Sequence, residues 1–241
     1  MVTILYLIRH GETEGSDTPR YKGSIDVPLS EKGIYQMKEA SEFIREYLKS
    51  VSSSKYLSYL KDIHATTDDY DKAEKRESTE SVSALQGIVP PGLEAVYTSD
   101  LSRAVRSAQI IAEPFGLLPV ETPDFRERNF GVWEGMAFTE IKEKYPKEFE
   151  SWANNPLKYS PVAGESTVRV KDRVLPSLTR ILNSHKGKNI AVVAHGGVNR
   201  IILCHFLGIP LENIFRIEQG YAAVNIIEFW EKYPVVKLLN G

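Results

Sequence analysis

The stretch ILYLIRHGE at residues 4–12 passes from apolar to charged residues without a transition. The run at residues 3–8 is short, apolar and β-branched at both ends, which is typical of a strand buried in a parallel sheet. In such sheets, ligands bind just beyond the carboxyl ends of the strands. We therefore expect Arg9 and His10 to lie at a binding crevice, with Gly11 allowing a tight turn or a close approach of the backbone to a ligand.

The rest of the chain alternates strand-like and helix-like patterns. Strands are expected at residues 3–8, 93–98, 119–122 and 189–194, and a hairpin at 223–230 and 235–239. Helices are expected at residues 30–49, 100–115, 138–145, 147–152, 166–184 and 198–207. Pro176 should kink or split the helix at 166–184. The alternation predicts an α/β fold: a three-layer α/β/α sandwich with a mostly parallel central sheet.

One segment breaks this alternation. Residues 50–92 contain three consecutive serines, mixed charges and a Pro-Pro-Gly end, without a strong apolar stripe. We interpret the segment as a solvated insertion within a single domain of residues 1–241. A lid over the site, or a subunit contact and with it a homodimer, are the alternatives.

Charge and cysteine content limit the partners and the compartment. The formal net charge of −2 gives no bulk attraction to nucleic acid or to an anionic membrane. A single cysteine, Cys204, leaves no internal disulfide and fits a reducing compartment. The N-terminal apolar run is too short for a signal-peptide core, and no stretch reaches the length of a membrane span. We expect a cytoplasmic protein that binds neither nucleic acid nor membrane.

Two further strand patterns end on residues that can bind anions. In IAVVAHGG, His195 and Gly196 follow the apolar run directly, and AVYTSDLSRA delivers Ser99 and then Arg103 from a helix start. Each of these alone is more often a turn or a solvated side chain. Together with the first strand end they supply two histidines, two arginines and free amides near helix N-termini. This combination predicts a phosphate-like oxyanion site at the carboxyl ends of the strands.

A metal site is the first alternative for the two histidines. Together with Glu12 or Glu127 they could ligate zinc. Both histidines would share their cavity with Arg9 and Arg103, which repel a dication. The His-x-x-x-His and Cys-x-x-Cys spacings are also absent from the sequence. We therefore expect neither a metal nor a cofactor.

Three blocks in this order, LIRHGET, SDLSRA and AHGG, resemble the histidine phosphatase superfamily. This family contains the cofactor-dependent phosphoglycerate mutases and many small-molecule phosphatases. The resemblance covers most of the chain outside residues 50–92. It implies hydrolysis of a small phosphorylated metabolite through a phosphohistidine.

The resemblance also implies a role for each strand-end residue. His10 would be the nucleophile, phosphorylated on Nε2, while Arg9, Arg103 and His195 would hold the transferring phosphoryl group. The backbone amide of Gly196 would add a donor. The chemistry agrees independently, since a histidine can be neutral near pH 7 and arginines stabilise charge on phosphoryl oxygens.

The remaining roles are carried by loops. RERNFG resembles the family's acid segment, which makes Glu127 the proton donor to the leaving oxygen; facing a phosphate dianion, it tends to keep its proton because like charges repel. The loop around YKGSIDVPLSEKG resembles the substrate side, so Thr13, Ser16, Lys22 and Gly23 are expected to bind substrate. Ser16 departs from the family pattern, because many members carry asparagine there, and a serine reaches less far.

Phosphatase and mutase are separated by weaker signals. The sequence after Glu127 resembles the phosphatase branch, including alpha-ribazole phosphatases, and mutases typically carry asparagine in place of Gly197. Lys22, Arg169 and Arg200 could still form the second phosphate site that a mutase needs. A binding module without catalysis is the third hypothesis, but binding alone needs no acid. We therefore expect a phosphatase.

Overall fold

The computed structural model describes residues 2–18, 20–51 and 92–241. Within this part of the chain, six strands form one sheet in the order β3-β2-β4-β1-β5-β6. The strands are β1 (Thr3–Arg9), β2 (Leu93–Thr98), β3 (Val120–Glu121), β4 (Asn189–Ala194), β5 (Val224–Phe229) and β6 (Pro234–Leu238). The α-helices are α1 (Glu31–Val51), α5 (Ser102–Ala112), α6 (Phe138–Lys144), α7 (Pro146–Asn154), α8 (Thr167–Ser184) and α9 (Gly196–Leu207). The 3-10 helices are η1 (Glu113–Phe115), η2 (Pro123–Phe125), η3 (Gly131–Trp133) and η4 (Leu211–Arg216).

The sheet is mostly parallel, as predicted. Strands β3, β2, β4 and β1 run parallel to their neighbours, whereas β5 is antiparallel to β1 and forms a hairpin with β6. Arg9 is in register with Ala194, and Thr98 with Val193. The residues that follow β1, β2 and β4 therefore emerge side by side at one edge of the sheet.

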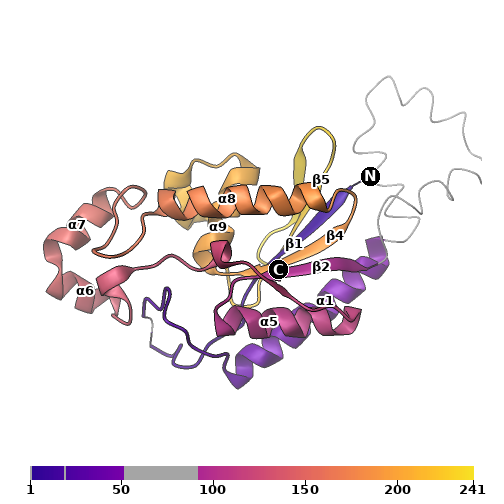
Figure 1. Ribbon diagram of the computed structural model, residues 1–241. Coiled ribbons are helices and arrows are strands. Elements are labelled where there is room, and N and C mark those ends of the chain that lie inside the picture. The colour runs from indigo at the N-terminus through magenta and orange to yellow at the C-terminus, as the bar shows by residue number, and fades with distance from the viewer. Residues whose placement is uncertain (1, 19, 52–91) are drawn as a thin grey trace, which may run out of the picture.

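Helices cover both faces of this sheet, giving the predicted three layers. Helices α1 and α5 lie on one face and α8 and α9 on the other, while α6 and α7 lie together beyond one end of the strands (Figure 1). Along β1, Ile4, Tyr6 and Ile8 belong to the core under α1 and α5, and Leu5 and Leu7 to the core under α8 and α9. The unbroken apolar run of β1 reflects burial on both faces, at about 1.5–3 kcal/mol for each large side chain.

Most predicted elements are confirmed, with shifts at their ends. Helix α9 begins at Gly196, two residues earlier than expected; His195 precedes it with an extended backbone (φ −127°, ψ 163°) and occupies the N-cap position without a side-chain capping hydrogen bond. Ser30 caps α1 as predicted, its Oγ accepting from Gly33 N–H at 3.0 Å.

The prediction that Pro176 would split its helix is wrong. Helix α8 continues through Pro176 as one element of 18 residues. Pro176 has no backbone N–H, so the carbonyl of Asp172, four residues earlier, lacks its helical hydrogen-bond donor. Both residues lie on the exposed side of the helix. Water can donate to that carbonyl, so the helix persists.

The predicted insertion lies almost entirely outside the described residues, which resume at Gly92. At its start, α1 continues to Val51, slightly past the expected end. In the described ranges, none of the helices has both the length and the apolar character needed to cross a membrane.

Candidate active site

The loop after β1 is fixed by backbone contacts. His10 N–H donates to Ala194 O of the neighbouring strand at 3.0 Å, and Gly11 N–H donates to Ser107 Oγ at 3.2 Å. A Cβ on Gly11 would collide with the carbonyl oxygen of Gly33 in the first turn of α1, and a Cβ on Gly33 would collide with Glu12 O. Gly11 is therefore required by the close approach of two segments of backbone, rather than by the approach of a ligand.

A cavity of about 430 Å³ lies beyond the strand ends. Every predicted site residue except His195 lines it: Arg9, His10, Thr13, Ser16, Lys22, Gly23, Arg103, Glu127 and Gly196. His195 is fully buried, and its ring centroid lies 5.1 Å from that of His10. The structure thus brings together in one place the site residues that come from separate blocks of the sequence.

His10 is held in the form that a nucleophile needs. Its Nδ1 lies 2.7 Å from Gly11 O, a carbonyl that can only accept, so Nδ1 carries the proton and Nε2 keeps its lone pair. Burial and the nearby charges of Arg9 and Arg103 hold the pKa of His10 well below its ordinary value. The imidazole is therefore neutral at neutral pH, with Nε2 as the free nucleophile.

Arg9 is oriented by two neighbours, Gln219 and Tyr221. Its Nη1 donates to Gln219 O at 2.6 Å, and its guanidinium lies over the ring of Tyr221, 4.0 Å from the centroid. Its buried Nε has no hydrogen-bond partner among the described residues. A Cβ built on Gly196 would lie 3.4 Å from this Nε, so the glycine keeps the space beside it open. Arg9 is therefore placed to donate to an oxyanion.

Arg103 ties the strand ends to the substrate-side loop. Its Nη1 donates to Ile25 O and its Nη2 to Gly23 O, both at 2.7 Å, and its side chain is almost fully buried. Burial lowers the pKa of both Arg103 and Arg9, but a guanidinium stays protonated in proteins. Two buried positive charges thus border the cavity, which favours a dianionic ligand.

His195 is oriented by Ser99, which follows β2. Ser99 Oγ accepts from Leu101 N–H at 3.3 Å and lies 2.7 Å from His195 Nε2. With the hydroxyl donating to Nε2, the proton of the neutral ring sits on Nδ1, which has no partner among the described residues. Burial, His10 and Arg103 lower the pKa of His195 well below its ordinary value. In that tautomer, His195 carries an N–H donor that has no partner among the described residues.

The carboxyl group of Glu127 is hydrogen-bonded to the first turn of α9. Its Oε2 accepts from Gly197 N–H at 3.0 Å and its Oε1 from Arg128 N–H at 2.8 Å. A Cβ at position 197 would lie 2.5 Å from Oε1, so a residue with a side chain would displace the carboxyl group. Glu127 is the one carboxylate among the described residues that line the cavity.

The substrate-side residues form a connected polar rim. Lys22 Nζ donates to Thr13 Oγ1 at 2.6 Å and to Ser16 Oγ at 3.2 Å, and these two hydroxyls lie 2.9 Å apart. Ser16 therefore faces the cavity although it is shorter than the family's asparagine. Arg200 also lines the cavity, but Arg169 does not; it lines a neighbouring hollow with Arg126 and Arg173. The three residues considered for a mutase's second phosphate site are not gathered in one place.

The sequence reasoning missed Tyr221, which lies over Arg9 and whose hydroxyl is 3.2 Å from Ser16 Oγ. It precedes β5, the antiparallel neighbour of β1. The start of an antiparallel strand lies at the same edge as the end of its neighbour. The predicted hairpin could have indicated this position, had strand starts been considered as well as strand ends.

The metal hypothesis gains no geometric support from the described residues. None of their His, Cys, Asp and Glu side chains form a group of three or more that could hold an ion. The two histidines instead face guanidinium groups, as the charge argument anticipated.

A mostly parallel α/β sheet with two neutral histidines and two arginines at the carboxyl ends of its strands, and one carboxyl group from a neighbouring irregular segment, defines an enzyme site for phosphoryl groups. Comparison with known proteins agrees: the model of the histidine phosphatase superfamily (branch 1) matches residues 5–85 and 80–241. The chain belongs to the histidine phosphatase superfamily.

Individual relatives and structures are similar over nearly the whole chain. Phosphoserine phosphatase 1 of Hydrogenobacter thermophilus is 28% identical over 237 residues, which cover 98% of this chain and 91% of the relative. The adenosylcobalamin/alpha-ribazole phosphatase of Escherichia coli K12 is 25% identical over 241 residues, covering 98% and 95%. The crystal structure of the alpha-ribazole phosphatase from Shigella flexneri has the same fold, with a TM-score of 0.74, 20% identity and coverage of 99% and 96%.

Proposed function

We propose that this phosphoric monoester hydrolase transfers the phosphoryl group of a small phosphorylated metabolite to His10 and then to water. One observation carries the proposal: a neutral, buried His10 with a free Nε2 shares one cavity with the guanidinium groups of Arg9 and Arg103 and with the carboxyl group of Glu127. The names of the two relatives, both phosphatases, support the same reaction class.

In the first step, His10 Nε2 attacks phosphorus, and the bond to the leaving oxygen breaks as the P–N bond forms. Arg9, Arg103 and the Nδ1–H of His195 donate to the phosphoryl oxygens, where charge is spread in the transition state. Glu127 gives its proton to the leaving oxygen, which an alkyl alkoxide requires. The alcohol then departs.

In the second step, water attacks the phosphohistidine and the P–N bond breaks. Glu127, now ionised, accepts a proton from the attacking water. Inorganic phosphate leaves, and His10 returns to its neutral form. Each residue of the first step is thus used again, and the protein needs no further proton carrier.

Hydrolysis is favoured over phosphoryl transfer between carbons by two features. The residues considered for a second phosphate site are divided between two hollows, with Arg169 away from Lys22 and Arg200. Position 197 holds a glycine, and only a glycine leaves room for the carboxyl group of Glu127 as it lies here.

The size of the cavity agrees with a small phosphorylated metabolite as substrate. Its volume of about 430 Å³ is in the range of sites that bind small molecules.

The experiment is a screen of the purified protein against a panel of phosphomonoesters, phosphoserine and alpha-ribazole phosphate among them, with release of inorganic phosphate as the readout. A second assay supplies 3-phosphoglycerate together with 2,3-bisphosphoglycerate. We expect phosphate release to exceed isomerisation. Efficient isomerisation with little free phosphate would instead establish the mutase.

A further inference from the structure

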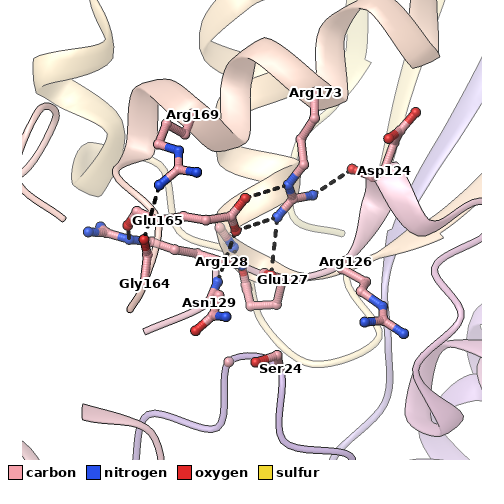
Figure 2. A network of polar contacts seen from close by, with 12 residues as sticks. Ser24, Asp124, Arg126, Glu127, Arg128, Asn129, Gly164, Glu165, Arg169 and Arg173 are labelled. Carbon is pink, nitrogen blue, oxygen red and sulfur yellow. Dashed lines mark hydrogen bonds and ion pairs between the residues drawn. The ribbon is translucent and has the colours of Figure 1, made fainter. Parts of the chain in front are cut away.

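The segment that carries Glu127, residues 124–129 (here the acid segment), has little regular structure of its own. Only its first two residues belong to the short helix η2, and η3 begins at Gly131. Side-chain groups from elsewhere in the chain therefore have to fix its position. Figure 2 shows that Glu165, which lies just before α8, and Arg173, which lies within α8, point into this segment.

Arg173 holds two carbonyls of the acid segment at once. Its Nη1 donates to Asp124 O at 2.6 Å, and its Nη2 donates to Glu127 O at 3.2 Å (Figure 2). The second of these is the backbone carbonyl of the catalytic acid itself. The planar guanidinium offers its donors in a fixed fork, so the two carbonyls are held at a set separation.

Glu165 binds both Arg173 and the acid segment. Its carboxylate accepts from Arg173 Nε and Nη2, each at 2.9 Å, and from Asn129 N–H at 3.0 Å. Its own backbone N–H donates to Asn129 O at 2.8 Å. Burial alone would raise the pKa of Glu165, but the hydrogen bonds from Arg173 and from Asn129 hold that pKa below its ordinary value. The pair is therefore ionised on both sides at neutral pH.

The pair is anchored to the rigid part of the molecule. Val170 and Val174, which flank Arg173 on α8, are buried in the same core as Phe125 of the acid segment. Neither Arg173 nor Glu165 lines the catalytic cavity. Both residues contact the acid segment directly, and the charge of Arg173 also helps to lower the pKa of His195, so the test has to separate an effect on the acid from an effect on phosphoryl binding.

We propose that Arg173, together with Glu165, is a positioning residue that sets where the carboxyl group of Glu127 meets the leaving oxygen. The inference rests on the proposed function, since it takes Glu127 as the acid. A misplacement of about 1 Å can lower a rate by about 10²-fold. Loss of the Arg173 contacts should thus slow the step that needs the acid and spare the step that does not.

The test compares Arg173→Met with Arg180→Met. Arg180 lies on the same helix and contacts the same segment, but through the exposed side chain of Asp124 at 3.3 Å rather than the backbone. Each variant is assayed for turnover of an alkyl phosphate and for the nitrophenolate burst from p-nitrophenyl phosphate, whose leaving group needs no proton. For Arg173→Met we expect kcat on the alkyl ester to fall by about 10–10²-fold with the burst rate within about threefold. Arg180→Met should change neither.

The same substitution in a Glu127→Gln background gives the second measurement. If Arg173 acts through Glu127, its removal should add no further loss on the alkyl ester, because residues that act as one unit are non-additive. Equal losses on both esters, or a full additional loss in the Glu127→Gln background, would overturn the proposal. If Arg173→Met does not fold, Glu165→Gln takes its place. This substitution keeps the size of the side chain and weakens the hydrogen bonds that Glu165 makes with Arg173 and Asn129.

Failure of the underlying function has a different signature. In that case Glu127→Gln would itself lower the reaction rates of both esters equally, or the wild-type protein would release no phosphate. The positioning role is contradicted when Glu127→Gln is selective for the alkyl ester and Arg173→Met either is not selective or adds its full loss in the Glu127→Gln background.

Discussion

The phosphoryl-binding side of the cavity and the acid side are built differently. His10, Arg9 and His195 follow strands whose backbone ladders fix them to the centre of the sheet. Glu127 sits on an irregular segment held by two side chains from and beside α8. The first arrangement rests on backbone hydrogen bonds between strands, whereas the second rests mainly on side-chain contacts, those of the Arg173–Glu165 pair and those of Arg126 and Arg128. We expect single substitutions outside the cavity to disturb the acid side far more easily.

The largest expected effect belongs to the phosphoryl-binding side. His10→Ala removes the nucleophile and should lower turnover by about 10⁴-fold or more, as loss of a nucleophile commonly does. It should also abolish acid-labile labelling of the protein by the substrate's phosphate. His205→Ala, at an exposed position on α9, is the matched control and should leave both readouts intact. Activity that is lost on chelation and regained with zinc or magnesium would contradict the expectation that the reaction needs no metal.

Glu127→Gln should come next, with an effect confined to substrates that need an acid. The amide keeps the size of the side chain but has no acidic proton to give. We expect hydrolysis of an alkyl phosphate to fall by about 10²–10⁴-fold, and the nitrophenolate burst to change much less. Comparable losses of the phosphorylation step for both esters would mean that Glu127 binds or positions rather than protonates.

Gly197→Ala tests whether the acid side depends on the space left by one missing side chain. The new Cβ would lie 2.5 Å from Glu127 Oε1 and should push the carboxyl group away, lowering alkyl phosphate turnover by about 10–10²-fold. Alanine is a better helix former than glycine, so urea unfolding should show no loss of stability. Unchanged turnover would show that the carboxyl group can act from another position.

The smallest expected effect is a difference in pH dependence: the phosphoryl-binding side and the acid side should lose their contributions to stability at different pH values. The pKa values of His10 and His195 are depressed on folding, so below about pH 6.5 the unfolded chain binds more protons and stability falls as pH falls. Each histidine can contribute at most about 1.4 kcal/mol per pH unit. The pKa of Glu165 is also depressed, so its contribution should persist over this range and be lost only below about pH 4.5.

Urea unfolding between pH 7.5 and 5 measures both contributions. His10→Asn should flatten the decline in unfolding free energy, whereas Glu165→Gln should lower the whole curve by a constant amount. A constant offset for His10→Asn as well would show that this histidine does not take up a proton on unfolding.

The sequence predicted the sheet and its strand ends because both depend on local patterns. Burial on two faces produces the unbroken apolar run of β1, and the parallel direction of β1, β2 and β4 brings His10, Arg103 and His195 to one edge. The position of Glu127 came from the family resemblance alone. No local pattern marks an acid on an irregular segment.

The parts that could not be predicted depend on contacts between distant segments. Arg173 looks like an ordinary charged residue of an amphipathic helix, yet it holds carbonyls of the acid segment. Tyr221 precedes the strand beside β1, and only the order of strands in the sheet places it over Arg9. Pro176 was expected to break α8, but its exposed position lets water replace the lost donor.

The contact between Gly11 and Gly33 has a consequence for protein engineering. A side chain on either glycine would collide with the backbone of the facing segment, so neither position is free to vary. A library that randomises either position alone would sample almost entirely inactive clones. Diversity intended to alter substrate preference belongs instead at the rim, at residues such as Thr18, Arg20 and Phe138, which line the cavity without meeting that constraint.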